Sequence, residues 1–327
     1  MRSVELTRTF RLSLLVAVLS VLAGCAAAVP PPPRVAEKPP APKVGLATVL
    51  AAVAKAPSLR TLPADLTPSL STSGDDVGFD NERCEAGPKA DRIDACVFGD
   101  RAAATDVVLY GDSHAGMWLP AMAEIAERLH WRLQFYGKPG CPAVQLTVWN
   151  QQEQRPFGEC DRFRDYVTGQ VAVNRPELVI VTNESFSQKR DRGRLITAAE
   201  WSTGLTQTLR TLRRSAGHVI VLGNTPVLDA SAPECLAAHQ SDIAACSTPR
   251  AVATARTWNA ADREAAAATG SGYVSVLPWL CTTTCPAVIG NVTVYRNRFH
   301  LSATYARMLN GVLEEALLKH FPSNAAP

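Results

Sequence analysis

Short apolar runs alternate with helical patterns from about residue 104 almost to the end of the chain. The β-favouring runs are TDVVLY (105–110), WRLQFYG (131–137), ELVIVT (177–182), HVIVLG (218–223) and GYVSVL (272–277). Helical patterns cover 115–130, Cys160 to Val173, Thr197 to about Arg214, 249–268 and Ser302 to Lys319. Apolar strands that alternate with helices are typical of a parallel sheet covered on both faces. The sequence therefore predicts a three-layer α/β/α sandwich with about five parallel strands.

The first 25 residues have the pattern of an export signal. Arg2, Arg8 and Arg11 precede a short apolar run, LSLLVAVLSVLAG, which is too short for a comfortable transmembrane helix. LAGC, which ends at Cys25, resembles the lipobox of bacterial lipoproteins, in which the cysteine is lipidated and becomes the mature N-terminus. An ordinary signal peptide cleaved near CAAA is the alternative. We expect an exported protein, lipid-anchored at Cys25 to the outer face of the bacterial cytoplasmic membrane or otherwise periplasmic.

Composition divides the rest of the chain into four parts. Residues 26–45 are rich in Pro and Ala and predict an extended tether. Residues 46–103 predict an irregular N-terminal wrap with a disulfide loop, after one short helix in LATVLAAVAKA. Residues 104–320 form the regular α/β domain, and residues 321–327 are expected to be a disordered tail. The net charge of +3 is small, and no basic run is interleaved with aromatic residues, so nucleic acid is not an expected partner.

Eight cysteines follow Cys25, and an even number in an exported chain favours disulfides. Eight cysteines allow 105 pairings. Proximity along the chain favours Cys84–Cys96, Cys141–Cys160, Cys235–Cys246 and Cys281–Cys285. Zinc is the alternative for CTTTC, but no second ligand pair stands at metal spacing and no histidine cluster is nearby. We expect no metal.

The first predicted strand, at 105–110, runs directly into Gly-Asp-Ser-His. In parallel sheets the functional side chains gather at the C-terminal ends of the strands, which is where Ser113 stands. A serine hydroxyl needs a base to become a nucleophile, and His300, after the last strand, is the best placed of six histidines. The alternative for Ser113 is a plain helix-capping turn. The alternative for His300 is a structural role at the start of a helix.

GDSHA, KPGC and NRFHLSATYA together resemble the SGNH (GDSL-like) hydrolases. More narrowly, they resemble the periplasmic SGNH domain attached to membrane acyltransferases that O-acylate cell-envelope glycans. The similarity covers about residues 80–320. It implies an SGNH, flavodoxin-like fold in which Ser113 is the nucleophile and His300 the general base. The backbone N–H groups of Ser113 and Gly140 would form the oxyanion hole.

Two positions depart from the family pattern. Asn183 stands where the family often has an oxyanion-hole asparagine, but the sequence reads VTNES in place of Gly-x-Asn-Asp. Its alternative role is to satisfy backbone groups of a turn. The family's Asp-x-x-His reads Asn297-Arg298-Phe299-His300, so an amide replaces the acid that orients the imidazole. Asn297 is then a neutral orienter that presents its carbonyl oxygen to the imidazole, or a loop residue beside a serine–histidine dyad held by a backbone carbonyl.

We therefore expect an exported serine esterase or O-acyltransferase that uses an acyl-serine intermediate. Its substrates would be acyl esters, acetyl esters above all, of cell-envelope glycans or small molecules. No cofactor is expected. If the protein transfers the acyl group, a separate membrane acyltransferase is implied as a partner, because no acyl-supplying transmembrane domain is evident in the sequence. The alternatives are a non-catalytic glycan-binding or assembly lipoprotein with a degenerate SGNH site, and a structural envelope protein stabilised by its disulfides.

Overall fold

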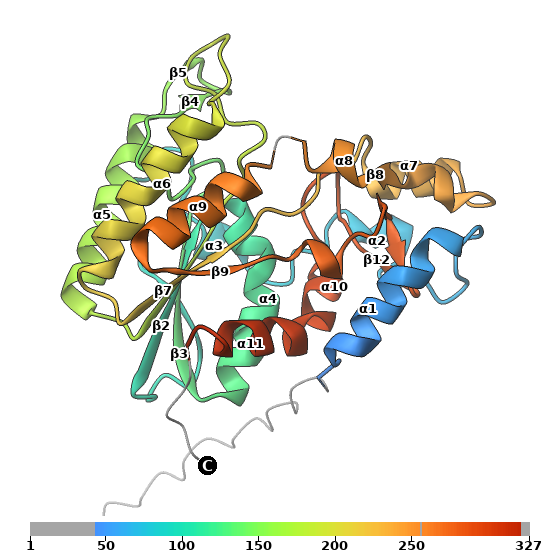
Figure 1. Ribbon diagram of the computed structural model, residues 1–327, viewed down its shortest axis with the longest axis horizontal. Helices are drawn as coiled ribbons and strands as arrows, with labels where there is room; N and C mark the ends of the chain where they lie inside the picture. The colour runs from blue at the N-terminus through green and yellow to red at the C-terminus, as the bar shows by residue number, and fades with distance from the viewer. Residues whose placement is uncertain (1–42, 256, 322–327) are drawn as a thin grey trace, which may run out of the picture. The chain divides into compact units, whose positions relative to one another are not determined.

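The computed structural model describes residues 43–255 and 257–321 (Figure 1). The expected signal segment 1–25, with Cys25, lies outside the described residues, as do most of the 26–45 tether and residues 322–327. No helix of the described part is long and apolar enough to cross a membrane.

A six-stranded sheet forms the centre of the fold, with the strand order β1-β3-β2-β6-β7-β9. The strands are β1 (Cys96–Gly99), β2 (Thr105–Gly111), β3 (Trp131–Gly137), β6 (Leu178–Thr182), β7 (His218–Leu222) and β9 (Gly272–Val274). The five from β3 to β9 are parallel, and β1 is antiparallel at one edge. The chain order reverses at β2, so the crevice at the C-terminal ends of β2 and β6 is the expected place for a site.

Helices cover both faces of this sheet. They are α4 (Ser113–Arg128), α5 (Gly158–Asn174), α6 (Ala198–Arg213), α9 (Asn259–Thr269), α10 (Ala303–Met308) and α11 (Asn310–Leu318). Figure 1 shows α5, α6 and α9 on one side and α4, α10 and α11 on the other. Alternate strand residues feed the two cores: Val107 and Leu109 pack with α4, whereas Val108 and Tyr110 pack with α5 and α6. The predicted three-layer α/β sandwich is confirmed.

The remaining elements are short and lie mostly in the connections and the N-terminal segment. The helices are α1 (Leu46–Lys55), α2 (Leu70–Ser73), α3 (Asn81–Cys84), α7 (Ala232–Ala238) and α8 (Arg250–Ala253), with 3-10 turns η1 (Ala56–Ser58), η2 (Ile243–Cys246) and η3 (Leu277–Trp279). The strand pairs are β4 (Trp149–Asn150) with β5 (Arg155–Pro156), β8 (Thr248–Pro249) with β10 (Thr284–Cys285), and β11 (Val288–Ile289) with β12 (Val292–Thr293).

Three of the predicted elements differ from the structure. The helix expected over 249–268 is two helices, because the chain turns before α9 and Trp258 adopts a left-handed conformation with φ 40°. The helix expected from Ser302 to Lys319 is divided between α10 and α11 at Leu309. The strand expected over 272–277 ends at Val274, since β9 is an edge strand and the chain leaves the sheet there for η3.

The segment expected as an irregular wrap contributes to the sheet. Within 46–103, β1 pairs with β3 along its whole length, so the wrap supplies the sheet's sixth strand. The folded part is also slightly longer than 46–320. Lys43 forms an ion pair with Glu314, and Phe321 is buried against Trp131.

Four disulfides join the eight cysteines after Cys25. They are Cys84–Cys96, Cys141–Cys160, Cys235–Cys246 and Cys281–Cys285, the pairs expected from proximity. The sulfurs of Cys281 and Cys285 are bonded to each other, so they are not available as zinc thiolates. Across residues 43–255 and 257–321, no group of three His, Cys, Asp or Glu side chains is arranged to hold a metal ion.

Candidate active site

Ser113 is the first residue of α4 and follows β2 at the reversal of strand order. Asp112 caps the helix: one carboxylate oxygen accepts the N–H of His114 at 2.8 Å, and the other accepts the N–H of Glu184 at 2.8 Å. The cap therefore ties the start of α4 to the end of β6. At Gly111, a Cβ would lie 1.9 Å from the carbonyl oxygen of Thr182, so only glycine allows the two strands to approach there.

His300 reaches Ser113 from a loop between β12 and α10. Its Nε2 lies 2.8 Å from the Ser113 Oγ, and its Nδ1 lies 2.9 Å from Nδ2 of Asn297. The loop is fixed to the segment after β7, because Leu228 and Arg298 exchange hydrogen bonds of 2.8 and 2.9 Å. The structure thus brings together three residues that the sequence singled out, in the order serine, histidine, amide.

The orientation of the Asn297 amide follows from its other bonds. Its Oδ1 accepts the backbone N–H groups of Phe299 and His300, at 3.0 and 2.9 Å. Both of these are donors, so the oxygen must face them and the NH₂ group must face the imidazole. The expectation that Asn297 presents its carbonyl oxygen to His300 is therefore wrong. No backbone carbonyl takes that place either, because Nδ1 is bonded to the amide nitrogen.

This arrangement determines the tautomer of neutral His300. An amide NH₂ group only donates, so Nδ1 must accept and the ring proton lies on Nε2. The Nε2–H then donates to the Ser113 Oγ. A general base needs the opposite tautomer, with a free lone pair on Nε2 facing the hydroxyl. The ground-state geometry therefore holds the right atoms at the right distances in an unreactive protonation pattern.

Charge at His300 is also disfavoured. Burial, with smaller contributions from nearby His114 and Arg296, lowers its pKa to about 2. His114 is itself buried, with its ring centroid 5.3 Å from that of His300 and no hydrogen-bond partner on either ring nitrogen among the described residues. Burial lowers the pKa of His114 to about 3. The uncharged ring of His114 thus packs edge-on against the imidazole of His300.

The candidate oxyanion-hole groups lie at the ends of three neighbouring strands. Ser113 opens α4, so its N–H has no acceptor within the helix. Gly140, in the loop after β3, has φ +68° and open space where a Cβ would lie, so glycine is required there by backbone conformation. Asn183, directly after β6, uses its Oδ1 to accept the N–H of Ala143 at 2.6 Å. That bond leaves its NH₂ group as a donor beside the loop that carries Gly140.

Comparison with protein-family models gives one match to this chain. The model described as "SGNH domain (fused to AT3 domains)" matches residues 83–315. The chain belongs to the SGNH family. It is an SGNH-type serine hydrolase or acyltransferase, as the sequence motifs indicated.

A solved structure shares this fold. The periplasmic domain of a lipopolysaccharide acetyltransferase from Salmonella ser. Paratyphi A is 12% identical, with a TM-score of 0.56, and the match covers 77% of this chain and 97% of that one. A mutant of Axe2, an acetyl-xylooligosaccharide esterase from Geobacillus Stearmophilus, is 11% identical, with a TM-score of 0.42 over 68% and 96% of the two chains. No curated protein matches in sequence. At such identities the first of these shows the fold alone.

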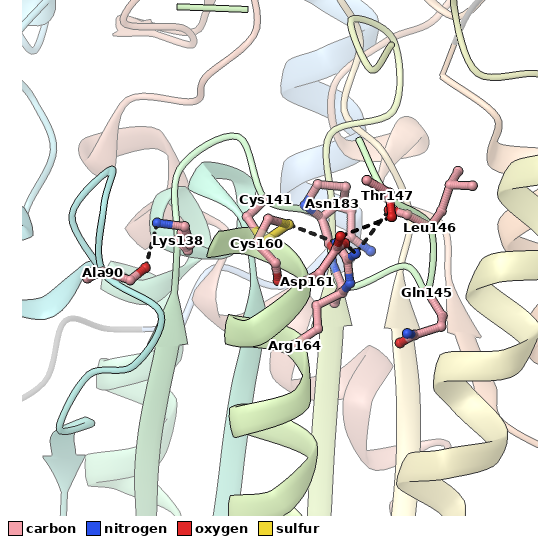
Figure 2. The surroundings of a disulfide bond; sticks show 12 residues. Ala90, Lys138, Cys141, Gln145, Leu146, Thr147, Cys160, Asp161, Arg164 and Asn183 are labelled. Carbon is pink, nitrogen blue, oxygen red and sulfur yellow. Dashed lines mark hydrogen bonds and ion pairs between the residues drawn. A yellow bond between two sulfur atoms is a disulfide. The ribbon is translucent and has the colours of Figure 1, made fainter. Parts of the chain in front are cut away.

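Lys138, which the sequence analysis quoted in KPGC but gave no role, anchors one wall of the SGNH site. Its Nζ donates to the carbonyl oxygens of Gly87, Pro88 and Ala90 at 2.6, 3.0 and 2.9 Å. All three ammonium protons are thereby used, and burial lowers the pKa of Lys138 to about 8. In Figure 2 Lys138 reaches Ala90 from the end of β3. A lysine at a strand end before Pro-Gly-Cys was the only sequence signal.

The Cys141–Cys160 disulfide fixes the other end of the same loop to α5. Arg164 donates to the carbonyl of Leu146 at 3.0 Å and forms an ion pair with Asp161, and Asp161 accepts the Thr147 hydroxyl at 2.9 Å. Figure 2 shows this cluster beside the disulfide, with Asn183 close by. The loop that carries Gly140 is therefore held at both ends, as an SGNH oxyanion hole requires.

Polar groups after β6 and β7 form a second support that sequence reasoning missed. Buried Asp262 accepts from Trp201 and Asn224, each at 2.8 Å. Asn224 in turn accepts the N–H and hydroxyl of Ser185, at 3.1 and 3.0 Å. The network positions the segment that begins at Asn183. Since its members are far apart in sequence, no local pattern could have indicated it.

Two cavities open at the site of this SGNH domain. A small one, of about 20 Å³, is lined by Ser113, Met117, Leu301, Glu85 and Arg296, among others. A larger one, of about 440 Å³, is lined by Gly140 and Glu184 and shares Glu85 with the first.

Protonation of Glu85 can be measured through its effect on the stability of the protein. Burial raises the pKa of Glu85 to about 7, from an ordinary 4.5, against the opposing charge of Arg296. Because the folded state holds this proton more tightly than the unfolded state, the stability that it contributes is lost as pH rises from about 5 to 8. We expect Glu85→Gln and wild type to have similar free energies of unfolding at pH 5. At pH 8 the free energy of unfolding of Glu85→Gln should be about 2–3 kcal/mol higher than that of wild type.

Urea unfolding of wild type and Glu85→Gln at both pH values checks this expectation. Glu82→Gln is the matched control, because Glu82 is an exposed glutamate in α3, the short helix that ends just before Glu85. A free energy difference between wild type and Glu85→Gln that does not change with pH would contradict it.

Proposed function

We propose that this protein is an exported serine esterase or O-acyltransferase acting on acetyl esters of cell-envelope glycans. The observation that carries the proposal is the 2.8 Å contact between the Ser113 Oγ and Nε2 of His300 at the reversal of strand order. Export is supported by four disulfides, which persist only in an oxidising compartment. The Salmonella neighbour, described as a lipopolysaccharide acetyltransferase, supports a glycan ester as substrate.

The reaction would begin when His300 adopts its other tautomer, in which the ring proton moves from Nε2 to Nδ1 and the Asn297 amide turns away from it. The Ser113 Oγ would then attack the ester carbonyl carbon, while the Ser113 proton passes to the free lone pair on Nε2 of His300. The N–H groups of Ser113 and Gly140 and the NH₂ group of Asn183 would hold the resulting oxyanion. His300 then returns the proton to the sugar oxygen as the carbon–oxygen bond breaks, which leaves an acyl-serine. Water regenerates the serine in an esterase, and a second sugar hydroxyl does so in a transferase.

The size of the small cavity supports an acetyl group. Its volume of about 20 Å³ is close to the room that one water-sized probe needs, which is about 10–15 Å³. Met117 and Leu301 give it apolar walls next to Ser113. A methyl group fits such a space, whereas a longer acyl chain would need these side chains to move.

A fluorophosphonate probe tests the proposal directly, since only an activated serine reacts with it. We expect slow labelling of wild type, mapped by peptide mass spectrometry to Ser113, together with slow hydrolysis of p-nitrophenyl acetate. Labelling of another serine, with Ser113 unmodified, would assign the chemistry elsewhere. If the acyl group is transferred, a separate membrane acyltransferase would supply it.

Attachment to the membrane is a further part of the proposal. Cys25 follows Leu-Ala-Gly and precedes a Pro-rich segment, and it lies outside the described residues. We expect the mature protein to fractionate with membranes, and Cys25→Ser to be released or to accumulate as the unprocessed precursor. Membrane fractionation and the intact mass of the mature N-terminus measure this. Normal processing with unchanged membrane retention in Cys25→Ser would exclude lipidation.

A further inference from the structure

The larger cavity borders the candidate active site. Asn81 and Glu85 line both this cavity and the small one that contains Ser113, and Gly140 lines the larger one. A ligand in the larger cavity would therefore lie next to the small cavity at Ser113. Its volume of about 440 Å³ falls in the range of sites for small molecules, which is about 300–1,000 Å³.

Four segments far apart in sequence build this cavity. They are 81–88 after α3, 139–140 after β3, 149–157 around β4 and β5, and 184–188 after β6. Three of them are held in place by contacts outside the cavity. Lys138 fixes the first, the Cys141–Cys160 disulfide spans the base of the third, and Asp112 binds the N–H of Glu184. A rigid cavity of this kind is typical of a preformed binding site.

The lining combines aromatic surface with neutral hydrogen-bonding groups. Trp149 and Phe157 supply the rings, and Asn81, Asn150 and Gln152 supply amides. Oδ1 of Asn150 accepts the N–H groups of Gln152 and Glu153, each at 3.0 Å, so its NH₂ group remains a donor. Amides that both donate and accept match sugar hydroxyls, which do the same, while the C–H face of a sugar ring suits an aromatic ring.

The charge of the cavity selects among sugars. Its acidic lining residues are Glu82, Glu85 and Glu184, and the described residues place no lysine or arginine in the lining. Burial raises the pKa of both Glu85 and Glu184, so the exposed Glu82 is the main source of negative charge. Lys138 lies behind Phe157, but three carbonyl oxygens already hold its ammonium group. A carboxylate or phosphate on the ligand would face the Glu82 carboxylate, with no cation among the described residues that line this cavity; Arg296 lines only the small one.

We propose that this cavity binds the ring of a neutral sugar, the one whose ester or hydroxyl reacts at Ser113, and that it rejects uronic acids and phosphorylated sugars. The inference rests on the proposed function and adds the substrate class. Trp149 and Gln152 are its binding residues, and Glu82 contributes to the rejection of anions.

Three probes test this. Mono-O-acetylated methyl β-D-glucopyranoside and its glucuronate counterpart differ only in one carboxylate, and p-nitrophenyl acetate is an ester without a sugar. Wild type should prefer the neutral glucoside over the glucuronate by about tenfold or more in kcat/KM at low salt, and less at high salt. Glu82→Lys should reduce the ratio of kcat/KM for the glucoside to kcat/KM for the glucuronate.

The variants of the cavity should change the ratio of kcat/KM for the neutral sugar ester to that for p-nitrophenyl acetate. We expect Trp149→Ala to lower this ratio about tenfold through KM, Trp149→Phe to restore most of it, and Gln152→Ala to lower it by about threefold. Gln207→Ala is the matched control, since Gln207 is an exposed amide on α6 away from the cavity. It should leave the ratio unchanged.

Binding without turnover separates this proposal from the proposed function. Saturation-transfer NMR on Ser113→Ala should detect the neutral glucoside and lose its signal when Trp149→Ala is added. If that binding is seen while wild type hydrolyses no ester, the esterase proposal fails and the sugar site stands. If the glucuronate binds as well as the glucoside, or Trp149→Ala and Gln152→Ala behave as wild type, the sugar site is wrong even in an active enzyme.

Discussion

Asn297→Asp is expected to raise kcat/KM for p-nitrophenyl acetate by about 10² to 10⁴. In a serine protease the reverse change, aspartate to asparagine, lowers turnover by about 10⁴, largely through the wrong histidine tautomer. The geometry here predicts the same defect. One oxygen of an aspartate could keep the N–H groups of Phe299 and His300, while the other would accept from Nδ1 of His300 at the present 2.9 Å.

The same substitution should change the pH profile. In wild type the pKa of His300 is lowered to about 2, so this group stays neutral throughout the neutral range. A carboxylate beside Nδ1 favours the imidazolium and raises that pKa. We expect kcat/KM of Asn297→Asp to decrease as pH falls through the raised pKa of His300. This gives the pH profile an acidic limb that the wild-type profile lacks.

Two controls accompany this prediction. Asn174→Asp adds the same charge at the exposed end of α5 and should leave the rate unchanged. The intact mass of the wild-type preparation must also be checked, because deamidation of Asn297 would itself create the aspartate. An unchanged rate in Asn297→Asp would mean that Asn297 does not limit the base strength of His300.

Ser113→Ala is expected to have an effect that depends on residue 297. In a serine protease, loss of the nucleophile costs about 10⁶ in kcat, and loss of the acid alone removes about 10⁴ of that. In the wild-type background, with an amide already in place, Ser113→Ala should therefore cost only about 10². In the Asn297→Asp background it should cost about 10⁶. The four enzymes form a double-mutant cycle with strong coupling.

Fluorophosphonate labelling, far-UV circular dichroism and kcat/KM for p-nitrophenyl acetate measure this cycle. Ser113→Ala should keep the wild-type spectrum and lose all labelling. Equal losses in the two backgrounds would show that residue 297 and Ser113 act independently. That result would contradict the coupling expected from their shared contacts with His300. If wild type and Asn297→Asp are both inert to ester and probe, Ser113 is not a nucleophile in this chain.

Local sequence was sufficient for the central layers of the fold. The runs at 105–110, 131–137 and 177–182 are apolar enough to be buried on both faces, and each became a strand within one residue of its expected bounds. The capping box at Thr197 and Glu200 formed as the sequence indicated. Local sequence was insufficient where tertiary packing overrides helix propensity. An alanine-rich run at 249–268 contains good helix formers, but it is broken because the chain must turn before α9.

For the candidate site, too, some features were predictable from the sequence and others were not. Family motifs and the rule that parallel strands end at one edge determined that Ser113, His300, Gly140 and Asn183 belong to one site. Only the tertiary structure decided how Asn297 is oriented, because that depends on two backbone N–H groups that turn toward its oxygen.

The sequence by itself thus determined the layered fold, the disulfide partners close in sequence and the candidates for the reacting groups, since each is encoded by a local pattern. The tertiary structure decided the tautomer of His300, the anchoring of residues 87–90 by Lys138, and the cavity beside Ser113. These depend on the directions of hydrogen bonds and on contacts between segments far apart in the chain. Local propensity and spacing carry no information about either.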